Sequence, residues 1–288
     1  MSNPLLNWWP SPAKLNLFLH INGRYENGYH QLQSLFQILD YGDELAFDVN
    51  TSNNITLADP IAGVADKDNL IIKAAHLLKS TLSDIKSKSL GCNIYLRKRL
   101  PMGGGIGGGS SNAATTLLVL NKLWNCHLSE AELIALGLTL GADVPIFIYG
   151  KTAFAEGVGE KLEQVSLSTK TYLVLFPDSH VSTAEIFSLP NLPRNTAKIN
   201  FNDYSFDNTH NDCQELVCER DPNVAKALHW LLEYAPSRMT GTGSCVFAMF
   251  EHRQDALNVQ ALLPKDSISF VANGVSTSPL HRQFQAQV

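Results

Sequence analysis

Hydrophobic and polar residues alternate near the start of the chain. Aliphatic residues occupy every second position from residue 13 to residue 21, and Lys14 and Asn16 lie between them on the opposite face. Side chains of a strand point to its two faces with a period of two. The pattern therefore predicts a half-buried strand over residues 13–21, with Lys14 and Asn16 on its polar face.

The rest of the chain alternates between strand-like and helix-like segments. Ser129 and Glu132 form a capping-box sequence that predicts the start of one helix. Because the order lacks a strict strand–helix alternation, the pattern favours an α+β fold. Strands are predicted at residues 33–40, 43–49, 92–96, 146–149, 152–156, 172–176, 245–250 and 268–272. Helices are predicted at residues 69–82, 110–125, 129–141, 182–188, 224–234 and 255–263, and a long loop at 189–206.

A domain boundary is predicted near residues 157–161, where glycines interrupt the pattern. This divides the chain into an N-terminal domain, residues 1–160, and a C-terminal domain, residues 161–288. A length of 288 residues with 44% hydrophobic residues suits one or two folded domains.

Charge and cysteine content narrow the function classes. The net charge of −5 argues against a general nucleic-acid surface, although Arg97, Lys98 and Arg99 form a small basic cluster, either a solvated strand end or a group near phosphate. The five cysteines are irregularly spaced without a C-x-x-C pair, which predicts reduced thiols and no zinc site. There is no run of 18 apolar residues and no signal-peptide pattern at the N-terminus, so we expect a cytoplasmic protein.

A glycine-rich segment carries the strongest functional signal. Six of the seven residues from Gly103 to Gly109 are glycine, between a predicted strand and a predicted helix. Free N–H groups and the helix dipole favour an anion at such a junction. A flexible linker is the alternative, but linkers seldom lie between two regular elements. The segment is therefore predicted to hold phosphate.

Two common phosphate-binding patterns fit this segment poorly. The dinucleotide pattern G-x-G-x-x-G is matched, yet the acidic residue expected about 20 positions later is missing, because Glu130 and Glu132 fall in a helix. The Walker pattern fails because Gly109 stands where lysine is required. The balancing positive charge must then come from elsewhere in the chain.

Three separated segments resemble the motifs of the GHMP kinases, the superfamily of galactokinase, homoserine kinase and mevalonate kinase. They are residues 12–16, the glycine-rich segment, and the Thr-Gly-Thr-Gly-Ser sequence at 240–244. The resemblance implies a two-lobed fold with the active site in the cleft between the lobes, and ATP held without a Walker lysine. The residues it assigns to ATP are Pro101, Met102, Gly103, Gly104, Gly105, Ile106, Gly107, Gly108, Gly109, Ser110 and Ser111.

A closer resemblance covers nearly the whole chain. Residues 11–17, 28–30, 100–112, 141–145 and 189–195 resemble one branch of the superfamily, whose alcohol substrate carries a cytidine diphosphate group. This implies transfer of the γ-phosphoryl group of Mg-ATP to the 2-hydroxyl of a cytidine-diphosphate-linked methylerythritol, in the non-mevalonate route to isopentenyl diphosphate. The residues that hold Mg²⁺ stay open.

The resemblance also assigns the catalytic pair. Asp143 would accept the hydroxyl proton, and Lys14 would lie beside it, orient the hydroxyl and stabilise developing charge. Without the resemblance, Asp143 would be interpreted as a turn residue before a proline and Lys14 as a solvated lysine. Phosphoryl transfer needs both a place for the proton and positive charge, so these residue types suit the chemistry.

The cytidine group is assigned to an aromatic site. Tyr29 and Phe187 would stack on the base, His30 would hydrogen-bond its edge, and Asn16 would reach the same substrate from the strand that carries Lys14. The Gly28-Tyr29-His30 sequence favours this substrate over homoserine or mevalonate, which another GHMP kinase would use. Without the resemblance, Phe187 would be interpreted as a core residue of a short helix.

Two other classes of function compete with the kinase. A non-catalytic nucleotide-binding protein is disfavoured because it would have no use for Lys14 and Asp143, and a dinucleotide-dependent oxidoreductase lacks its ribose-binding acid. The expected ligands are small molecules, without nucleic acid or membrane. The oligomeric state stays open between a monomer and a weak dimer.

Overall fold

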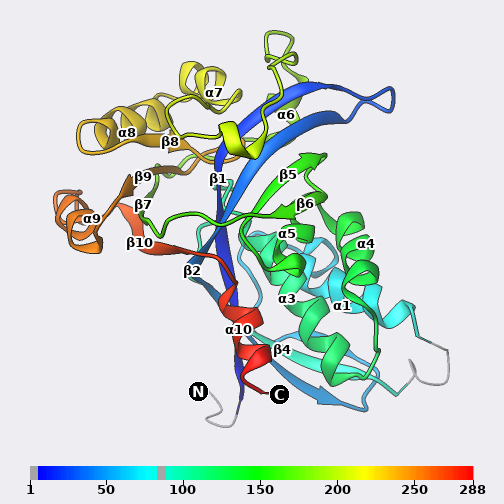
Figure 1. The fold of residues 1–288 in the computed structure, drawn as a ribbon. Helices are drawn as coiled ribbons and strands as arrows, with labels where there is room; N and C mark the ends of the chain where they lie inside the picture. The colour runs from blue at the N-terminus through cyan, green and yellow to red at the C-terminus, as the bar shows by residue number, and fades with distance from the viewer. Residues whose placement is uncertain (1–5, 83–88, 288) are drawn as a thin grey trace.

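Two long antiparallel strands run through the molecule and connect its two halves (Figure 1). They are β1 (Trp8–Arg24) and β2 (His30–Asn50). The computed structural model describes residues 6–82 and 89–287, so residues 1–5 of the N-terminal segment considered above lie outside the described chain.

Strands on either side of this pair complete a mixed sheet. The others are β3 (Ile55–Leu57), β4 (Gly91–Arg97), β5 (Ala153–Gly157), β6 (Lys161–Gln164), β7 (Thr171–Phe176), β8 (Ser237–Met239), β9 (Val246–Phe250) and β10 (Ile268–Val275). The main path runs β3-β4-β2-β10-β7-β9-β8, while β1 and β5 also pair with β2, and β6 with β5. All these pairs are antiparallel except β3 with β4.

Helices pack on each half of the sheet. The first half carries η1 (Asp66–Asp68), α1 (Leu70–Ser80), α3 (Gly108–Leu123), α4 (Glu130–Leu140) and α5 (Val144–Tyr149). The second half carries α6 (Thr183–Ser188), η2 (Phe201–Asp203), α7 (Gln214–Arg220), α8 (Pro222–Leu232) and α9 (Arg253–Gln260), whereas α10 (Pro279–Gln285) returns to the first half. One apolar core lies between the first-half helices and β2, β4 and β5, and another under α7, α8 and α9. The predicted α+β class is confirmed.

The predicted helices are confirmed to within a few residues of their bounds. Ser129 forms the expected capping box, because its side chain accepts from the backbone N–H of Glu132 and the Glu132 carboxylate accepts in return. Asn69 caps α1 in a similar way, by accepting from the N–H of Ile71. These local signals were sufficient to predict where the two helices begin, because each cap satisfies backbone groups within one turn of the helix.

The prediction of a half-buried first strand was wrong. Lys14, Asn16 and His20 are as buried as the aliphatic residues between them. Loops from distant parts of the chain cover this polar face: the Lys14 N–H donates to the carbonyl of Ile106, and the Leu19 N–H donates to the carbonyl of His210. An alternating pattern shows which residues are polar but not which loops will cover them.

Residues 33–40 and 43–49 form one strand, not two. Gly42 falls between the two predicted strands, but it lies opposite Pro12 within the β1–β2 pair. A Cβ atom at Gly42 would lie 2.1 Å from the carbonyl oxygen of Ser11. Glycine is therefore needed here for the close approach of two backbones, and β2 continues past it.

The predicted strand at residues 146–149 is the short helix α5. Asp143 precedes the helix, Pro145 lies in its first turn, and Gly150 ends it with a φ of 66°. A run of four apolar residues fits a buried helix as well as a strand, so tertiary packing determines which of the two forms. α5 packs against α3 and α4 and so places Asp143 beside the glycine-rich segment.

The C-terminal helix returns to the N-terminal strand. No prediction was made for α10, which buries Leu280 against Trp9 and places the ring of Phe284 4.7 Å from that of Trp9. Figure 1 shows α10 alongside the long strands, at the end of the molecule where the described chain begins. β3, β6, β8 and α7 were also not predicted. The division at residue 160 stays a prediction.

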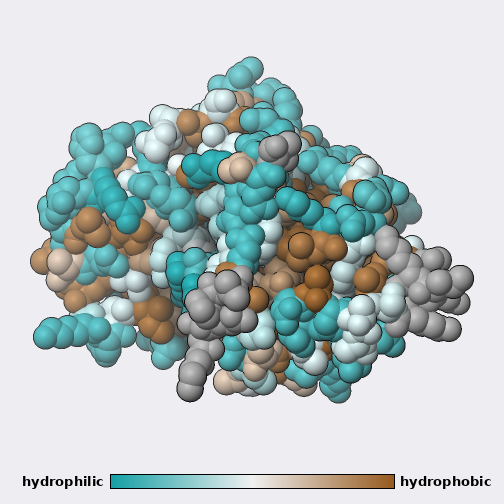
Figure 2. All heavy atoms as spheres, turned by 90° about the horizontal axis from the view of Figure 1, so that it is seen from below, coloured by the Kyte–Doolittle hydropathy of each residue, from teal (hydrophilic) through white to brown (hydrophobic). Residues whose placement is uncertain are grey.

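The surface is mixed in character. Figure 2 shows a mainly hydrophilic face in which apolar residues form separate groups. Within residues 6–82 and 89–287, no helix combines the length and the apolar character needed to cross a membrane. Within the described residues, all five cysteines lie outside disulfides, which agrees with the predicted reduced thiols, and Cys92, Cys213 and Cys245 are buried.

Candidate active site

Three distant segments meet near the middle of β1. The backbone N–H of Asn16 in β1 donates a 2.9 Å hydrogen bond to the hydroxyl oxygen of Thr240. The Cys245 N–H donates to the carbonyl of Gly104, which joins the second glycine loop, residues 239–244, to the glycine-rich segment. The three motifs that the sequence singled out therefore form one site.

The glycine-rich segment is a tightly packed loop before α3. Gly103, Gly105 and Gly107 have φ values of 72°, 70° and 75°, in the left-handed region that favours glycine. A Cβ atom at Gly105 would lie 2.4 Å from the carbonyl oxygen of Thr240. The loop can therefore lie against the second glycine loop only because this position has no side chain.

Lys14 and Asp143 form an ion pair. Lys14 is 1% exposed. Its Nζ lies 3.2 Å from Oδ2 of Asp143, 2.5 Å from Oδ1 of Asn16 and 3.0 Å from the carbonyl oxygen of Gly105. The Asp143 side chain is about one-third exposed, and it lines two pockets. The pair thus places one fixed cation and one accessible carboxylate at the same point.

Two pockets meet at this pair. One, of about 350 Å³, is lined by the glycine-rich loop and by apolar residues including Ile61 and Val64. The other, of about 260 Å³, is lined by Lys14 and Asn16 from one half and by Thr183 and Phe187 from the other. Gly105, Ser110 and Asp143 line both. A group bound in the first pocket would therefore face a group bound in the second pocket, with the Lys14–Asp143 pair between them.

A third pocket, of about 540 Å³, continues from the second. It holds Tyr29, His30 and Phe187, and it shares Phe187 and Thr183 with the second pocket. The rings of His30 and Phe187 stack with centroids 4.9 Å apart, whereas Tyr29 is 64% exposed. The structure therefore brings His30 and Phe187 into contact and leaves Tyr29 at the rim.

The predicted ATP-loop residues do not all face the first pocket. Residues 101–110 line it, but Ser111 is fully buried and its hydroxyl accepts a 2.9 Å bond from Ser11. Of the basic cluster, Lys98 lines the first pocket, whereas Arg97 and Arg99 pair with Glu44. Of these three residues, only Lys98 thus lies where it could offset phosphate charge.

Asp43 supports the loop and was not predicted. This buried carboxylate accepts from the Lys98 ammonium at 2.7 Å, from the N–H groups of Arg99 and Leu100 at 2.7 and 2.8 Å, and from the Asn112 amide at 3.1 Å. It connects the residues that follow β4 to the N-terminal part of α3, on the two sides of the glycine-rich loop. No local signal distinguishes Asp43, because every one of these partners is remote in sequence.

Replacing Asp43 by asparagine should destabilise the fold. Loss of the charge leaves Lys98 without its anion, and breaking a buried ion pair costs about 3–5 kcal/mol. Asp48→Asn is the matched control on the same strand, because its exposed carboxylate accepts only a 3.3 Å bond from Asn93; it should change stability by about 0.5 kcal/mol or less. Urea unfolding of both variants measures this. Equal small losses would contradict a supporting role for Asp43.

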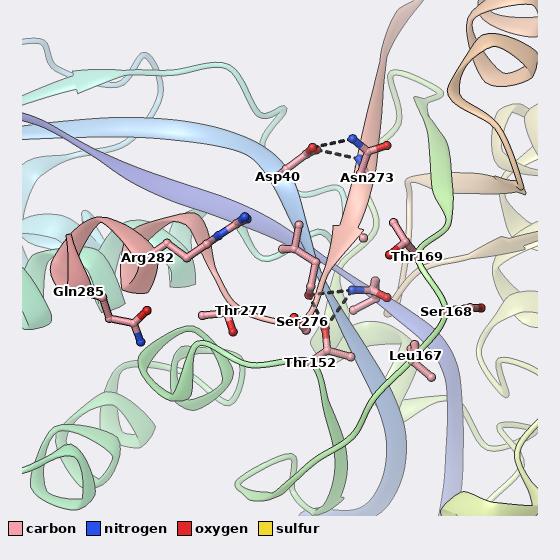
Figure 3. A pocket seen from close by; sticks show the side chains of 13 residues that line it. Asp40, Thr152, Leu167, Ser168, Thr169, Asn273, Ser276, Thr277, Arg282 and Gln285 are labelled. Carbon is pink, nitrogen blue, oxygen red and sulfur yellow. Dashed lines mark hydrogen bonds between the residues drawn. The ribbon is translucent and has the colours of Figure 1, made fainter.

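Another pocket lies away from these residues, where β2, β10 and α10 approach one another (Figure 3). Asp40 accepts there from the backbone and side-chain amides of Asn273, at 2.7 and 2.8 Å, and Arg282 extends from α10 toward the strands. None of the predicted site residues lines this pocket.

Comparison with known proteins identifies the class. The family described as "GHMP kinases N terminal domain" matches residues 69–151, and "GHMP kinases C terminal" matches residues 192–266. The chain belongs to the GHMP kinases, a family of ATP-dependent kinases, and the predicted two-lobed fold is confirmed.

Within the GHMP kinases, the chain is similar over nearly its whole length to kinases named for one substrate. The chain is 65% identical to a 4-diphosphocytidyl-2-C-methyl-D-erythritol kinase of Pseudoalteromonas atlantica, over 96% of this chain and 95% of the relative. It is 58% identical to the kinase of the same name in Shewanella woodyi, over 97% and 98% of the two chains. A crystal structure of 4-(cytidine 5'-diphospho)-2C-methyl-D-erythritol kinase matches with a TM-score of 0.80 and 28% identity, over 93% of this chain and 100% of that one.

Proposed function

We propose that the chain transfers the γ-phosphoryl group of ATP to the 2-hydroxyl of 4-diphosphocytidyl-2-C-methyl-D-erythritol. The products are the 2-phosphate and ADP, and the reaction belongs to the non-mevalonate route to isopentenyl diphosphate. The observation that carries the proposal is the row of three connected pockets with Lys14 and Asp143 where the first two meet. The names of the similar kinases support the same substrate.

ATP binds in the first pocket, and the cytidyl substrate binds in the second and third pockets. ATP occupies the first pocket, with its phosphates against the N–H groups of the glycine-rich loop and the start of α3. The methylerythritol group occupies the second pocket, which brings its hydroxyl to the Lys14–Asp143 pair. The cytidine occupies the third pocket, where Phe187 and Tyr29 offer stacking surfaces and His30 offers a hydrogen bond.

Lys14 and Asp143 act on the hydroxyl from one side. Asp143 accepts its proton as the oxygen attacks the γ-phosphorus. Lys14, fixed by Asn16 and by the carbonyl of Gly105, holds the carboxylate in place and stabilises the charge that develops on the transferred group. Most of the rate then comes from positioning and charge, as is usual for phosphoryl transfer.

Magnesium enters with ATP. Mg²⁺ keeps several waters and binds phosphate oxygens with one or two protein ligands, so it needs no dedicated cage. The described residues contain no group of three or more His, Cys, Asp or Glu side chains that could hold a metal ion by itself. The Ser110 side chain lies between the first two pockets and suits a single ligand to such an ion. The ion would offset the charge of the phosphates.

The remaining assignments follow from this reaction. We propose a cytoplasmic enzyme, a monomer or a weak dimer, whose ligands are small molecules rather than nucleic acid or membrane.

ADP release tests the substrate assignment. With Mg-ATP, the native chain should turn over the cytidyl substrate with a kcat/KM about 1,000-fold above that for homoserine or mevalonate, because those alcohols leave the third pocket empty. A pyruvate-kinase-coupled assay measures all three alcohols under the same conditions. Turnover of homoserine or mevalonate at the rate of the cytidyl substrate would point to another GHMP kinase.

A further inference from the structure

Arg194 connects the two residues that contact each other in the third pocket. It lies in the loop after α6, and its Nε donates to Nε2 of His30 at 3.0 Å. Its Nη2 donates to the carbonyls of both Phe187, at 3.1 Å, and Leu189, at 2.7 Å, near the C-terminal end of α6. One guanidinium therefore fixes both the histidine from the β1–β2 hairpin and the backbone of the residue stacked on it.

The bond to Arg194 determines how His30 can bind a ligand. A guanidinium is always a donor, so Nε2 must be an acceptor and the neutral ring must carry its proton on Nδ1. Within residues 6–82 and 89–287, no side chain or backbone group bonds His30 Nδ1, and His30 lines the third pocket. Partial burial and the positive charges of Arg194 and Arg24 lower the pKa of His30, which keeps the ring neutral.

We propose that Arg194 is a positioning residue that makes His30 an Nδ1–H donor and so selects cytosine over uracil. The inference rests on the proposed function, because it assigns the cytidine to this pocket. Cytosine N3 is an acceptor and pairs with the Nδ1–H donor. Uracil N3–H is itself a donor and would face the Nδ1–H donor of His30, so no hydrogen bond would form between them. A mismatch of this kind costs roughly 10- to 100-fold in binding.

The kinetic test compares two substrates that differ only in the base. The ratio of kcat/KM for the cytidyl substrate to that for its uridyl analogue should fall about tenfold or more in Arg194→Met, through KM, with kcat changed about threefold or less. Arg220→Met is the matched control, because Arg220 pairs with Glu185 of α6 on the surface and has no contact with His30. It should leave the ratio unchanged.

A double-mutant cycle separates positioning from general support of the fold. In His30→Ala, the ratio should already be low, and adding Arg194→Met should lower it no further, because both changes remove the same discrimination. An Arg194→Met ratio equal to that of the native chain, or a second full loss in the double variant, would overturn the proposal.

Nitrogen-15 NMR of the histidine rings tests the same point without turnover. The native chain should show His30 protonated at Nδ1, and Arg194→Met should show a shift toward the Nε2–H form. A native Nε2–H tautomer would overturn the proposal even if no variant could be prepared. If the native chain phosphorylates neither substrate, the proposed function fails, and the NMR spectrum still decides the role of Arg194.

Discussion

Replacing Asp143 by asparagine should lower kcat by roughly 100- to 10,000-fold, the range for loss of a general base. Asparagine keeps the size and hydrogen-bonding reach of the side chain but can neither accept the hydroxyl proton nor pair its charge with Lys14. The carboxylate lies 3.2 Å from Lys14 Nζ at the junction of the first two pockets. Steady-state ADP release measures kcat, and the KM values for both substrates should change much less.

Asp40→Asn provides the matched control. Asp40 is an exposed aspartate of β2 that bonds Asn273, at the separate pocket of Figure 3. This variant should keep the native kcat within about twofold, since surface substitutions away from a site have small effects. An Asp143→Asn variant as active as Asp40→Asn would contradict the assignment of Asp143 as the base.

Replacing Gly105 by alanine should lower the free energy of unfolding by about 3 kcal/mol or more. Two causes act together: the backbone has a φ of 70°, and the new Cβ atom would lie 2.4 Å from the carbonyl oxygen of Thr240. Since that carbonyl is backbone, it cannot move aside cheaply. The two glycine loops would separate, and the ATP affinity of the folded fraction should fall.

Gly109→Ala is the control for this effect on stability. Gly109 lies in the first turn of α3 without a positive φ, and a Cβ atom there would meet only Leu70, at an ordinary 3.5 Å. Its free energy of unfolding should change by about 1 kcal/mol or less. Urea denaturation of both variants decides the matter, and similar stabilities would mean that the contact between the glycine loops contributes little.

The parts of the structure that depend on local sequence could be predicted. The capped start of α4 satisfies its own backbone groups within one turn, and the order of strand, glycine-rich loop and helix could be read from neighbouring residues. The assignment of this loop to phosphate also came from the local pattern, and it stays a prediction. The helix α5 was missed because Val144 to Tyr149 is too short and too apolar for its period to be read.

The parts that depend on distant contacts could not be predicted from the pattern. Asp43 bonds Lys98, and Arg194 bonds His30, in each case a partner far away in the sequence. The polar face of β1 is buried because loops from distant parts of the chain cover it. The pairing of Lys14 with Asp143 was expected only from the resemblance to a family. The types of these two residues suit phosphoryl transfer, but only the fold brings Lys14 Nζ to 3.2 Å from Oδ2 of Asp143.

Phosphorus-31 NMR of the reaction of the native chain with Mg-ATP and 4-diphosphocytidyl-2-C-methyl-D-erythritol tests the central claim most directly. The account predicts one new phosphomonoester signal for each ADP formed, without three-bond coupling to a proton because the 2-carbon carries no hydrogen, and with the cytidine diphosphate signals retained. ADP accompanied only by inorganic phosphate, or a phosphoryl group placed anywhere but on the 2-hydroxyl, would contradict it.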